Sequence, residues 1–376
     1  MALNNFSVSR ILALDGIRGI AFLMVFFCHL GTLKTGQFGV DLFFVLSGFL
    51  ITSILLQEQR RHGSISINKF YLRRALRLLP ALFAVVLGVL LYTLIMEPFA
   101  KFLLALSDVW RIVLYIWNWT LATDWQHIVE RHQEMYTHLW SLSVEEQFYI
   151  VWPCLLLVLL RVPRPIVLLF LFAGIIAPAV ARFLMWHEGP ALWIYFRTDL
   201  RFDNLLYGAL VAWLLHWGYT PKGMSRKILS WAGLISLIGL IGIAVPDFLS
   251  HGEVYLGLFS LVALFSAVLI ASAVWCPLPP LRWLLEMKPL TWIGKVSYGL
   301  YLWHWPVVLM VSRMTYLPSK LGVDLTVTII TLTIVTISYY KLEQPFLKLK
   351  DRIGHAKKPR PSIDTPQVDE LSPQVS

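Results

Sequence analysis

The sequence predicts an all-α integral membrane protein that crosses the bilayer many times. Of its 376 residues, 57% are hydrophobic and only 14% are charged, whereas soluble domains carry about 25% charged residues. The mean hydropathy of the chain is +0.67. A water-soluble globule of this size would need more charge to cover its surface. Three cysteines are also too few for a disulfide framework, so soluble and disulfide-stapled classes are both excluded.

Long apolar runs mark the expected helices, because a membrane span needs roughly 20 apolar residues. Eleven such runs occur, at 11–32, 38–56, 79–98, 102–119, 142–160, 166–186, 203–218, 228–246, 255–275, 292–312 and 323–342. If all eleven crossed the bilayer, the two termini would lie on opposite sides.

Lysine and arginine residues indicate which loops face the cytoplasm, because loops rich in them stay inside. Residues 58–78 carry six basic residues and residues 341–360 carry seven. The basic segments share one side only if a single run in the first half of the chain does not cross. We assign this role to 102–119, which contains Asp108 and Arg111, as suits an interfacial or re-entrant helix.

The predicted architecture is therefore a polytopic helical bundle of about ten transmembrane helices plus one interfacial or re-entrant helix. Both termini are expected in the cytoplasm. Residues 1–350 form the membrane domain, and residues 351–376 form a cytoplasmic tail that we expect to be disordered. The net charge of +10 then marks the inner membrane face, so lipid is an expected partner and nucleic acid is not.

The first apolar run contains three ionisable residues, Asp15, Arg18 and His29. Charges in the hydrocarbon zone are costly and usually mark a pathway or a reaction site. Arg18 and His29 are 11 residues apart, so they return to nearly the same helix face, about 16 Å apart along the axis. This stripe favours a functional pair; the structural alternative is a buried histidine with a snorkelling arginine.

The second span follows a short connection, so the first two helices form an antiparallel hairpin. This arrangement places Asp41 near the depth of His29. A carboxylate beside an imidazole fixes its tautomer and raises its basicity, as a general base requires. Ser47 and Gly48 lie deeper, where small side chains allow either a neighbouring helix or a thin ligand to approach.

The basic segment after the second span places three arginines at the inner surface. Two of them, Arg74 and Arg77, are i, i+3 neighbours on a helix and could clasp phosphates through bidentate hydrogen bonds. Simple anchoring of the helix by positive charge is the alternative.

Further polar residues occur at span ends. Trp140 and Glu145 open the fourth span, where Glu145 either faces a polar cavity or snorkels to the outer surface. Arg201 and Asp203 lie at the outer end of the sixth span. For these two, an internal ion-pair cluster is at least as good an interpretation as substrate binding.

The last two spans contribute supporting residues. Tyr298 and His304 lie in the ninth span, and Glu343 ends the tenth at the inner side, near the depth of Arg18. An Arg18–Glu343 pair across the bundle fits these depths. The three cysteines lie in or beside apolar segments, so no metal site is expected.

Six motifs occur in a recognisable order: LDGIRGIAFLMVFFCHL, GVDLFFVLSGFLIT, FYLRRALRLLPAL, HLWSLSVEEQFY, SYGLYLWHWP and LEQPF. Each motif is weak alone, but the six together are specific. Through them the chain resembles the acyltransferase 3 family of polytopic membrane acyltransferases, which in bacteria acylate surface polysaccharides and some secondary metabolites. The resemblance covers roughly residues 10–350, almost the whole chain.

The resemblance implies that His29 is catalytic, with Arg18 as its partner. It implies that Arg74 and Arg77 act with an acyl-CoA donor on the cytoplasmic face. The donor is expected to be acetyl-CoA, a co-substrate and not a permanently bound cofactor, because short acyl groups are the family's usual cargo. The implied location is the bacterial inner membrane.

The resemblance also gives functional weight to Trp140 and Glu343. Many members carry an esterase-like soluble domain after the membrane part. We expect that domain to be absent here, so that any second transfer step would need a separate periplasmic partner.

Both lines of reasoning suggest one route for the donor. Acyl-CoA would dock its phosphates on Arg74 and Arg77, and its pantetheine arm would pass Arg18 and Ser47 toward His29.

At the end of that route His29, oriented by Asp41, would either deprotonate an acceptor hydroxyl or take the acyl group itself. Aromatic rings suit sugar faces and carboxylates suit hydroxyls, so a saccharide or small-molecule acceptor is expected near the outer openings. The candidate substrate-binding residues are Trp140, Glu145, Arg201 and Asp203.

Two other classes remain open at this point. Ten spans with buried charges also fit a proton-coupled secondary transporter of a polar solute. The sequence shows no internal repeat and no paired broken helices, which such a transporter often has. A catalytically silent scaffold of an envelope-assembly complex is the third possibility.

Overall fold

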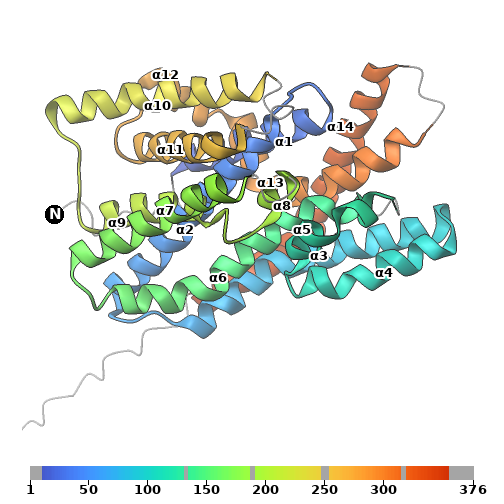
Figure 1. The fold of residues 1–376 in the computed structure, drawn as a ribbon, viewed down its shortest axis with the longest axis horizontal. Coiled ribbons are helices and arrows are strands. Elements are labelled where there is room, and N and C mark those ends of the chain that lie inside the picture. The colour runs from blue at the N-terminus through green and yellow to red at the C-terminus, as the bar shows by residue number, and fades with distance from the viewer. Residues whose placement is uncertain (1–10, 131–133, 187–190, 247–253, 315–318, 355–376) are drawn as a thin grey trace, which may run out of the picture.

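The computed structural model describes residues 11–130, 134–186, 191–246, 254–314 and 319–354, which form helices and turns with no strand. The first half of the chain forms α1 (Leu12–His29), η2 (Gly36–Phe38), α2 (Gly39–His62), α3 (Ile67–Met96), α4 (Phe99–Val113), α5 (Trp117–Glu130), η3 (Glu134–Leu139), α6 (Trp140–Leu159) and α7 (Arg164–Met185). The second half forms α8 (Ala191–Phe196), α9 (Phe202–His216), α10 (Gly223–Ala244), α11 (Val254–Trp275), α12 (Pro279–Leu285), α13 (Lys288–Ser312), α14 (Lys320–Ile337), η4 (Ser338–Glu343) and α15 (Gln344–Gly354). Figure 1 shows α10, α11 and α12 along one edge and α3 and α4 along the opposite edge, with α1 and α2 between them.

The fold is an all-α polytopic membrane protein, as predicted. Among the described residues, eight helical segments are long and apolar enough to cross a membrane. The other two predicted spans, 203–218 and 292–312, overlap α9 and α13. These two helices pack against α2 and α1, respectively. The orientation of the termini stays a prediction from the basic residues.

The predicted non-crossing run, 102–119, does not form one continuous helix. It is split between α4 and α5, and Tyr115 in the break has a φ of 56°, a left-handed conformation that a helix cannot continue through. Asp108 and Arg111 form an ion pair of 2.7 Å on α4. With 15 residues, α4 is about 22 Å long, less than the roughly 30 Å of a bilayer core.

Glycines bring the central helices close together. A Cβ atom added to Gly48 of α2 would overlap the carbonyl of Leu205, and one added to Gly208 of α9 would overlap the carbonyl of Val45. The two backbones therefore touch, as small residues permit in membrane bundles. This contact gives Gly48 the helix-packing role, while its neighbour Ser47 faces a cavity.

The predicted domain boundary lies inside a helix. The C-terminal helix α15 continues to Gly354, four residues beyond the boundary at 350. Residues 355–376, most of the predicted tail, lie outside the described residues.

Candidate active site

Two cavities lie one after the other along the central helices. The first, of about 410 Å³, is lined by four arginines and is called the arginine cavity below. The second, of about 340 Å³, is lined by His29 and His138 and is called the histidine cavity. On α1, the arginine cavity is reached by Arg18 and the histidine cavity by His29, so the predicted stripe joins the two cavities.

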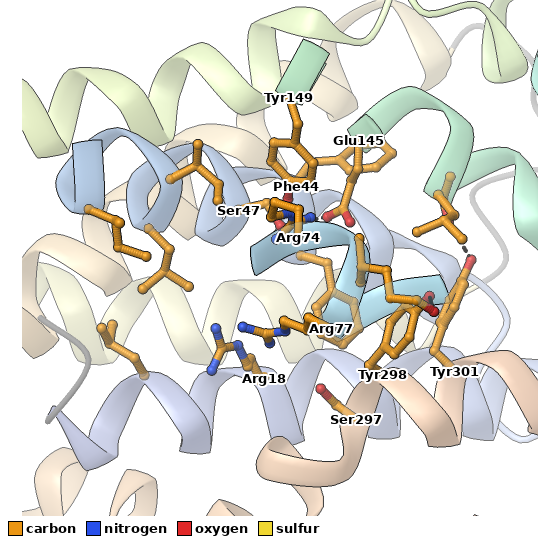
Figure 2. A pocket seen from close by; sticks show the side chains of 18 of the residues that line it. Arg18, Phe44, Ser47, Arg74, Arg77, Glu145, Tyr149, Ser297, Tyr298 and Tyr301 are labelled. Atoms are coloured by element: carbon orange, nitrogen blue, oxygen red, sulfur yellow. Dashed lines mark hydrogen bonds between the residues drawn. The ribbon is translucent and has the colours of Figure 1, made fainter. Parts of the chain in front are cut away.

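The arginines come from the start of α1 and the start of α3. Arg18, Arg73, Arg74 and Arg77 all line the arginine cavity, and Figure 2 shows the guanidinium groups of Arg18 and Arg77 directed toward one another. The i, i+3 spacing of Arg74 and Arg77 on α3 puts both on one face, as predicted. The cavity is therefore rich in positive charge.

The four guanidinium groups differ in how far they are neutralised. Arg18 pairs with Asp15 at 2.7 Å, and Arg73 pairs with Glu58 at 3.0 Å. Arg77, in contrast, makes no hydrogen bond or ion pair within the described part of the chain. Its charge is therefore available to an anion that enters the cavity.

Arg74 is held by two groups of α6. Its Nη2 donates to Glu146 at 2.8 Å, and its guanidinium lies 3.8 Å from the ring centre of Tyr149. These contacts fix the direction in which Arg74 points, and Glu146 is a neighbour of the cavity arginines to which the sequence analysis gave no role. The adjacent Glu-Glu pair was the signal, since one carboxylate so near the bilayer needs a cation.

Glu145 lies in a different place from the one expected. As a substrate-binding residue it was expected at the outer openings, but it lines the arginine cavity and accepts a 2.5 Å hydrogen bond from Ser47. Of the two alternatives that the sequence left open, the polar cavity is therefore the one that the structure shows. The helix explains the difference: Glu145 follows Trp140 by five residues, which is about 7.5 Å further along α6 and on another face. Trp140 itself lines the histidine cavity.

Aromatic side chains form much of the histidine cavity. Trp140 lies against Tyr195, with ring centres 4.7 Å apart, and Trp125, Phe196 and Trp305 complete the aromatic lining. The rings come from α5, α6, α8 and α13. Such a wall offers flat apolar faces beside the two imidazoles.

His29 is hydrogen bonded to a second histidine. Its Nδ1 lies 2.8 Å from Nε2 of His304. Nδ1 of His304 lies 2.6 Å from the carbonyl oxygen of Tyr301, and a carbonyl can only accept, so this nitrogen carries a proton. Nε2 of a neutral His304 then accepts, and Nδ1 of His29 donates. The remaining nitrogen, Nε2 of His29, keeps its lone pair for chemistry.

Asp41 does not contact His29, contrary to prediction. Its carboxylate is buried and accepts hydrogen bonds from Arg201, at 2.7 Å, and from Asn204. Helix α2 turns this face toward α9, while His29 at the end of α1 meets α13. His304 thus occupies the place expected for the carboxylate.

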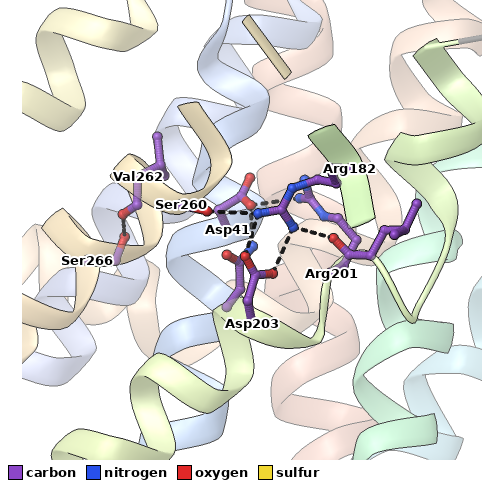
Figure 3. Close-up of polar contacts among 9 residues, drawn as sticks. Asp41, Arg182, Arg201, Asp203, Ser260, Val262 and Ser266 are labelled. Atoms are coloured by element: carbon purple, nitrogen blue, oxygen red, sulfur yellow. Dashed lines mark hydrogen bonds and ion pairs between the residues drawn. The ribbon is translucent and has the colours of Figure 1, made fainter. Parts of the chain in front are cut away.

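Arg201 and Asp203 are also placed differently from the substrate-binding expectation. Both are 0% exposed, and neither lines the arginine cavity or the histidine cavity. Figure 3 shows the buried ion-pair network, in which Asp203 pairs with Arg182 at 2.6 Å and Arg201 pairs with Asp41. The internal ion-pair alternative is the one that the structure shows.

This network lies behind the aromatic wall. The guanidinium carbon of Arg201 is 5.2 Å from the ring centre of Tyr195 and 5.7 Å from that of Trp140. Arg201 therefore supports the wall of the histidine cavity from outside, in a distance range where cation–π attraction operates.

The expected Arg18–Glu343 pair is not formed, because Arg18 pairs with Asp15 on its own helix. Glu343 is buried in the π-helical turn η4, where Ser338 donates to it at 3.4 Å. Tyr298 lines the arginine cavity and donates to the carbonyl of Leu78 at 2.9 Å.

Sequence comparison adds independent findings. The acyltransferase 3 family model, described as "Acyltransferase domain", matches residues 11–341. The O-acetyltransferase OatA of Staphylococcus aureus strain NCTC 8325 is 33% identical over 346 residues, which is 89% of this chain. OatA of strain MRSA252 gives the same values. The chain spans 57% of the length of these relatives. No solved structure matches the chain.

Proposed function

The chain belongs to the acyltransferase 3 family, and we propose that it moves an acyl group, in the first instance acetyl, from cytoplasmic acyl-CoA to a hydroxyl group of a saccharide or other exported acceptor. The relatives named O-acetyltransferase support the reaction type. The bacterial inner membrane is the proposed location. The observation that carries the proposal is the arginine cavity that adjoins a cavity containing a hydrogen-bonded histidine pair.

The arginine cavity suits the donor. Coenzyme A carries phosphate groups at one end and a thin pantetheine arm that ends in the thioester. Arg77 makes no salt bridge or hydrogen bond among the described residues, and Arg18 and Arg74 lie beside it. Guanidinium groups form strong, bidentate hydrogen bonds to phosphate. Along this cavity Ser47 and Glu145 offer polar atoms to the amides of the arm.

The histidine cavity suits the transfer step. Nε2 of His29 removes the proton of the acceptor hydroxyl while the hydroxyl oxygen attacks the thioester carbonyl. The new C–O bond forms, the C–S bond breaks, and the proton passes to the leaving thiolate of CoA. A route through an acyl-imidazole would use the same nitrogen as nucleophile. His304 keeps that nitrogen unprotonated by accepting from Nδ1 of His29.

The aromatic wall suits the acceptor. Trp140 and Tyr195 present flat faces beside His29, and such faces pack well against sugar rings. We therefore favour a saccharide over an apolar acceptor.

The test is acyl transfer by the purified protein in detergent, with acetyl-CoA labelled in the acetyl group. We expect slow release of label to water or to an added saccharide. His29→Ala should lower this rate by about 10²–10⁴-fold, the contribution of a positioned general base. His62→Ala, at the end of α2 and exposed, is the matched control and should keep the wild-type rate.

An unchanged rate in His29→Ala would overturn the proposal. Flux of a polar solute into liposomes without any dependence on CoA would instead favour the transporter interpretation.

A further inference from the structure

Two residues belong to the walls of both cavities. Val40 of α2 and Tyr301 of α13 line the arginine cavity and also the histidine cavity, and they are the only residues shared by the two linings that the structure describes. The boundary between the cavities therefore lies at these two side chains.

The spacing along α2 explains the position of Val40. The α2 residues that line the arginine cavity are Val40, Phe43, Phe44, Ser47, Leu50, Ile51 and Ile54. They recur every three or four residues, so they form a single stripe along one helix face. Val40 is the last residue of this stripe before the histidine cavity. On α13 the corresponding order is Ser297, Tyr298 and then Tyr301, which is the last to reach the arginine cavity.

Hydrogen bonds hold Tyr301 in place at this boundary. Its hydroxyl donates to the carbonyl of His138 at 2.8 Å and lies at hydrogen-bond distance, 2.6 Å, from the hydroxyl of Ser141. The ring cannot swing aside without losing both bonds. The aliphatic side chain of Val40 is buried, with 4% of its surface exposed. It has no polar group that would order a bound ligand, so its contribution at the boundary is its size.

We propose that Val40 and Tyr301 select the acyl group by its bulk. This inference rests on the proposed function. A thioester that enters from the arginine cavity has to place its acyl group between these two side chains before His29 can act on it. Acetyl is the smallest acyl group with a carbon chain, and each added methylene has to find space beside Val40. Protein cores are close-packed, so a methylene that does not fit is costly.

The test is a comparison of acetyl-, propionyl- and butyryl-CoA as donors for the purified full-length protein. The kcat/KM of the wild type should fall as the acyl group grows, so that acetyl-CoA is the best donor and butyryl-CoA the poorest. Val40→Ala should raise the ratio of butyryl to acetyl kcat/KM by about tenfold or more, since one methylene is worth roughly 10–200-fold in a hydrophobic pocket. Val40→Ile should lower the propionyl-to-acetyl ratio.

The matched control is Val45→Ala. Val45 lies on the same helix and is fully buried, but it lines neither cavity, so its ratios should equal those of the wild type. Ratios that are unchanged in both Val40 variants while acetyl transfer continues would overturn this inference alone. Absence of acyl transfer from every acyl-CoA in the wild type and in Val45→Ala would overturn the proposed function, and this inference with it.

Discussion

Nδ1 of His29 and Nε2 of His304 lie 2.8 Å apart although 275 residues separate them in the chain. The pair links α1 to α13, and the carbonyl of Tyr301 anchors its far end. A backbone carbonyl cannot donate a hydrogen bond. The Tyr301 carbonyl therefore determines which nitrogen of each histidine carries the proton in this hydrogen-bonded series. Under the proposed function His304 is a positioning residue, because it would act on the substrate only through His29.

The first prediction concerns His304. His304→Phe removes the acceptor for Nδ1 of His29. The tautomer with its proton on Nδ1, which leaves Nε2 free to act as a base, is then no longer favoured over the other tautomer. We expect kcat for acetyl-CoA turnover to fall by about 10²-fold, the lower end of a positioned base's contribution, while KM for acetyl-CoA stays unchanged. Steady-state kinetics with labelled acetyl-CoA measure both values.

His304→Gln is the matched conservative variant. Its amide can accept from His29 through oxygen and donate to the Tyr301 carbonyl through nitrogen, so it should recover part of the lost kcat. A purely structural role for His304 would instead change the yield of folded protein and leave kcat of the folded fraction intact.

The second prediction concerns Arg77. Its guanidinium makes no salt bridge or hydrogen bond among the described residues, so Arg77→Ala should weaken the binding of acetyl-CoA by about ten- to hundredfold. This range corresponds to one hydrogen bond to a charged group. Arg77→Lys keeps the charge but lacks the planar guanidinium group, so its affinity for acetyl-CoA should lie between those of the wild type and Arg77→Ala. Calorimetric titration with CoA provides the measurement.

Arg61→Ala serves as the control for Arg77, because Arg61 is exposed and lies outside the arginine cavity. Equal loss of affinity in the Arg61 and Arg77 variants would mean that general surface charge, and not the cavity, attracts CoA. Raised ionic strength would then weaken both equally.

The third prediction separates Asp41 from catalysis. Asp41→Ala leaves Arg201 charged and unpaired in a site with 0% exposure. Breaking a buried pair in this way costs about 3–5 kcal/mol of the free energy of unfolding. Thermal or denaturant unfolding in detergent should show this loss. The matched control, Asp199→Ala, breaks a pair whose Asp199 side chain is 49% exposed, and such pairs contribute about 0–1 kcal/mol.

If Asp41→Ala keeps wild-type stability and loses only turnover, the buried network is not the reason for the presence of Asp41. A role in the reaction, as first expected from the sequence, would then return.

The fourth prediction tests the contact between α2 and α9. Gly208→Ala would drive a methyl group into the carbonyl of Val45, and overpacking of this kind costs typically about 1–3 kcal/mol. Gly242→Ala on α10 meets nothing within 4 Å and should be neutral or slightly stabilising through helix propensity. Unfolding of the two variants under identical detergent conditions gives the comparison, and equal stability would show that α2 and α9 can separate without cost.

Much of the site was predictable because it depends on local geometry. The helical period places Arg18 and His29 on one face of α1, and it places Arg74 and Arg77 on one face of α3. The structure agrees on these two helix faces, since each is settled within a few turns of chain. The charge inside 102–119 predicted an interfacial or re-entrant helix; the structure shows this run divided between α4 and α5, and its relation to the membrane stays a prediction.

The partners of the buried charges could not be predicted in this way. Asp41 lies at the expected depth but faces α9, and its partner Arg201 is 160 residues away. His304 in the ninth predicted span was given only a supporting role, although the structure places it on His29. Glu145 faces the arginine cavity because of the rotation of α6 about its axis, and depth along the chain does not reveal that rotation.

The sequence by itself therefore determined the class of the protein, its helices and the faces that carry its charges, because hydropathy and the helical period act on neighbouring residues. Only the tertiary structure decided which helix faces meet. It brings His304 to His29 and Asp41 to Arg201, and it places Val40 and Tyr301 in the walls of both cavities. The physical reason is that helix rotation and pairing come from close packing between segments far apart in the chain, which no local pattern encodes.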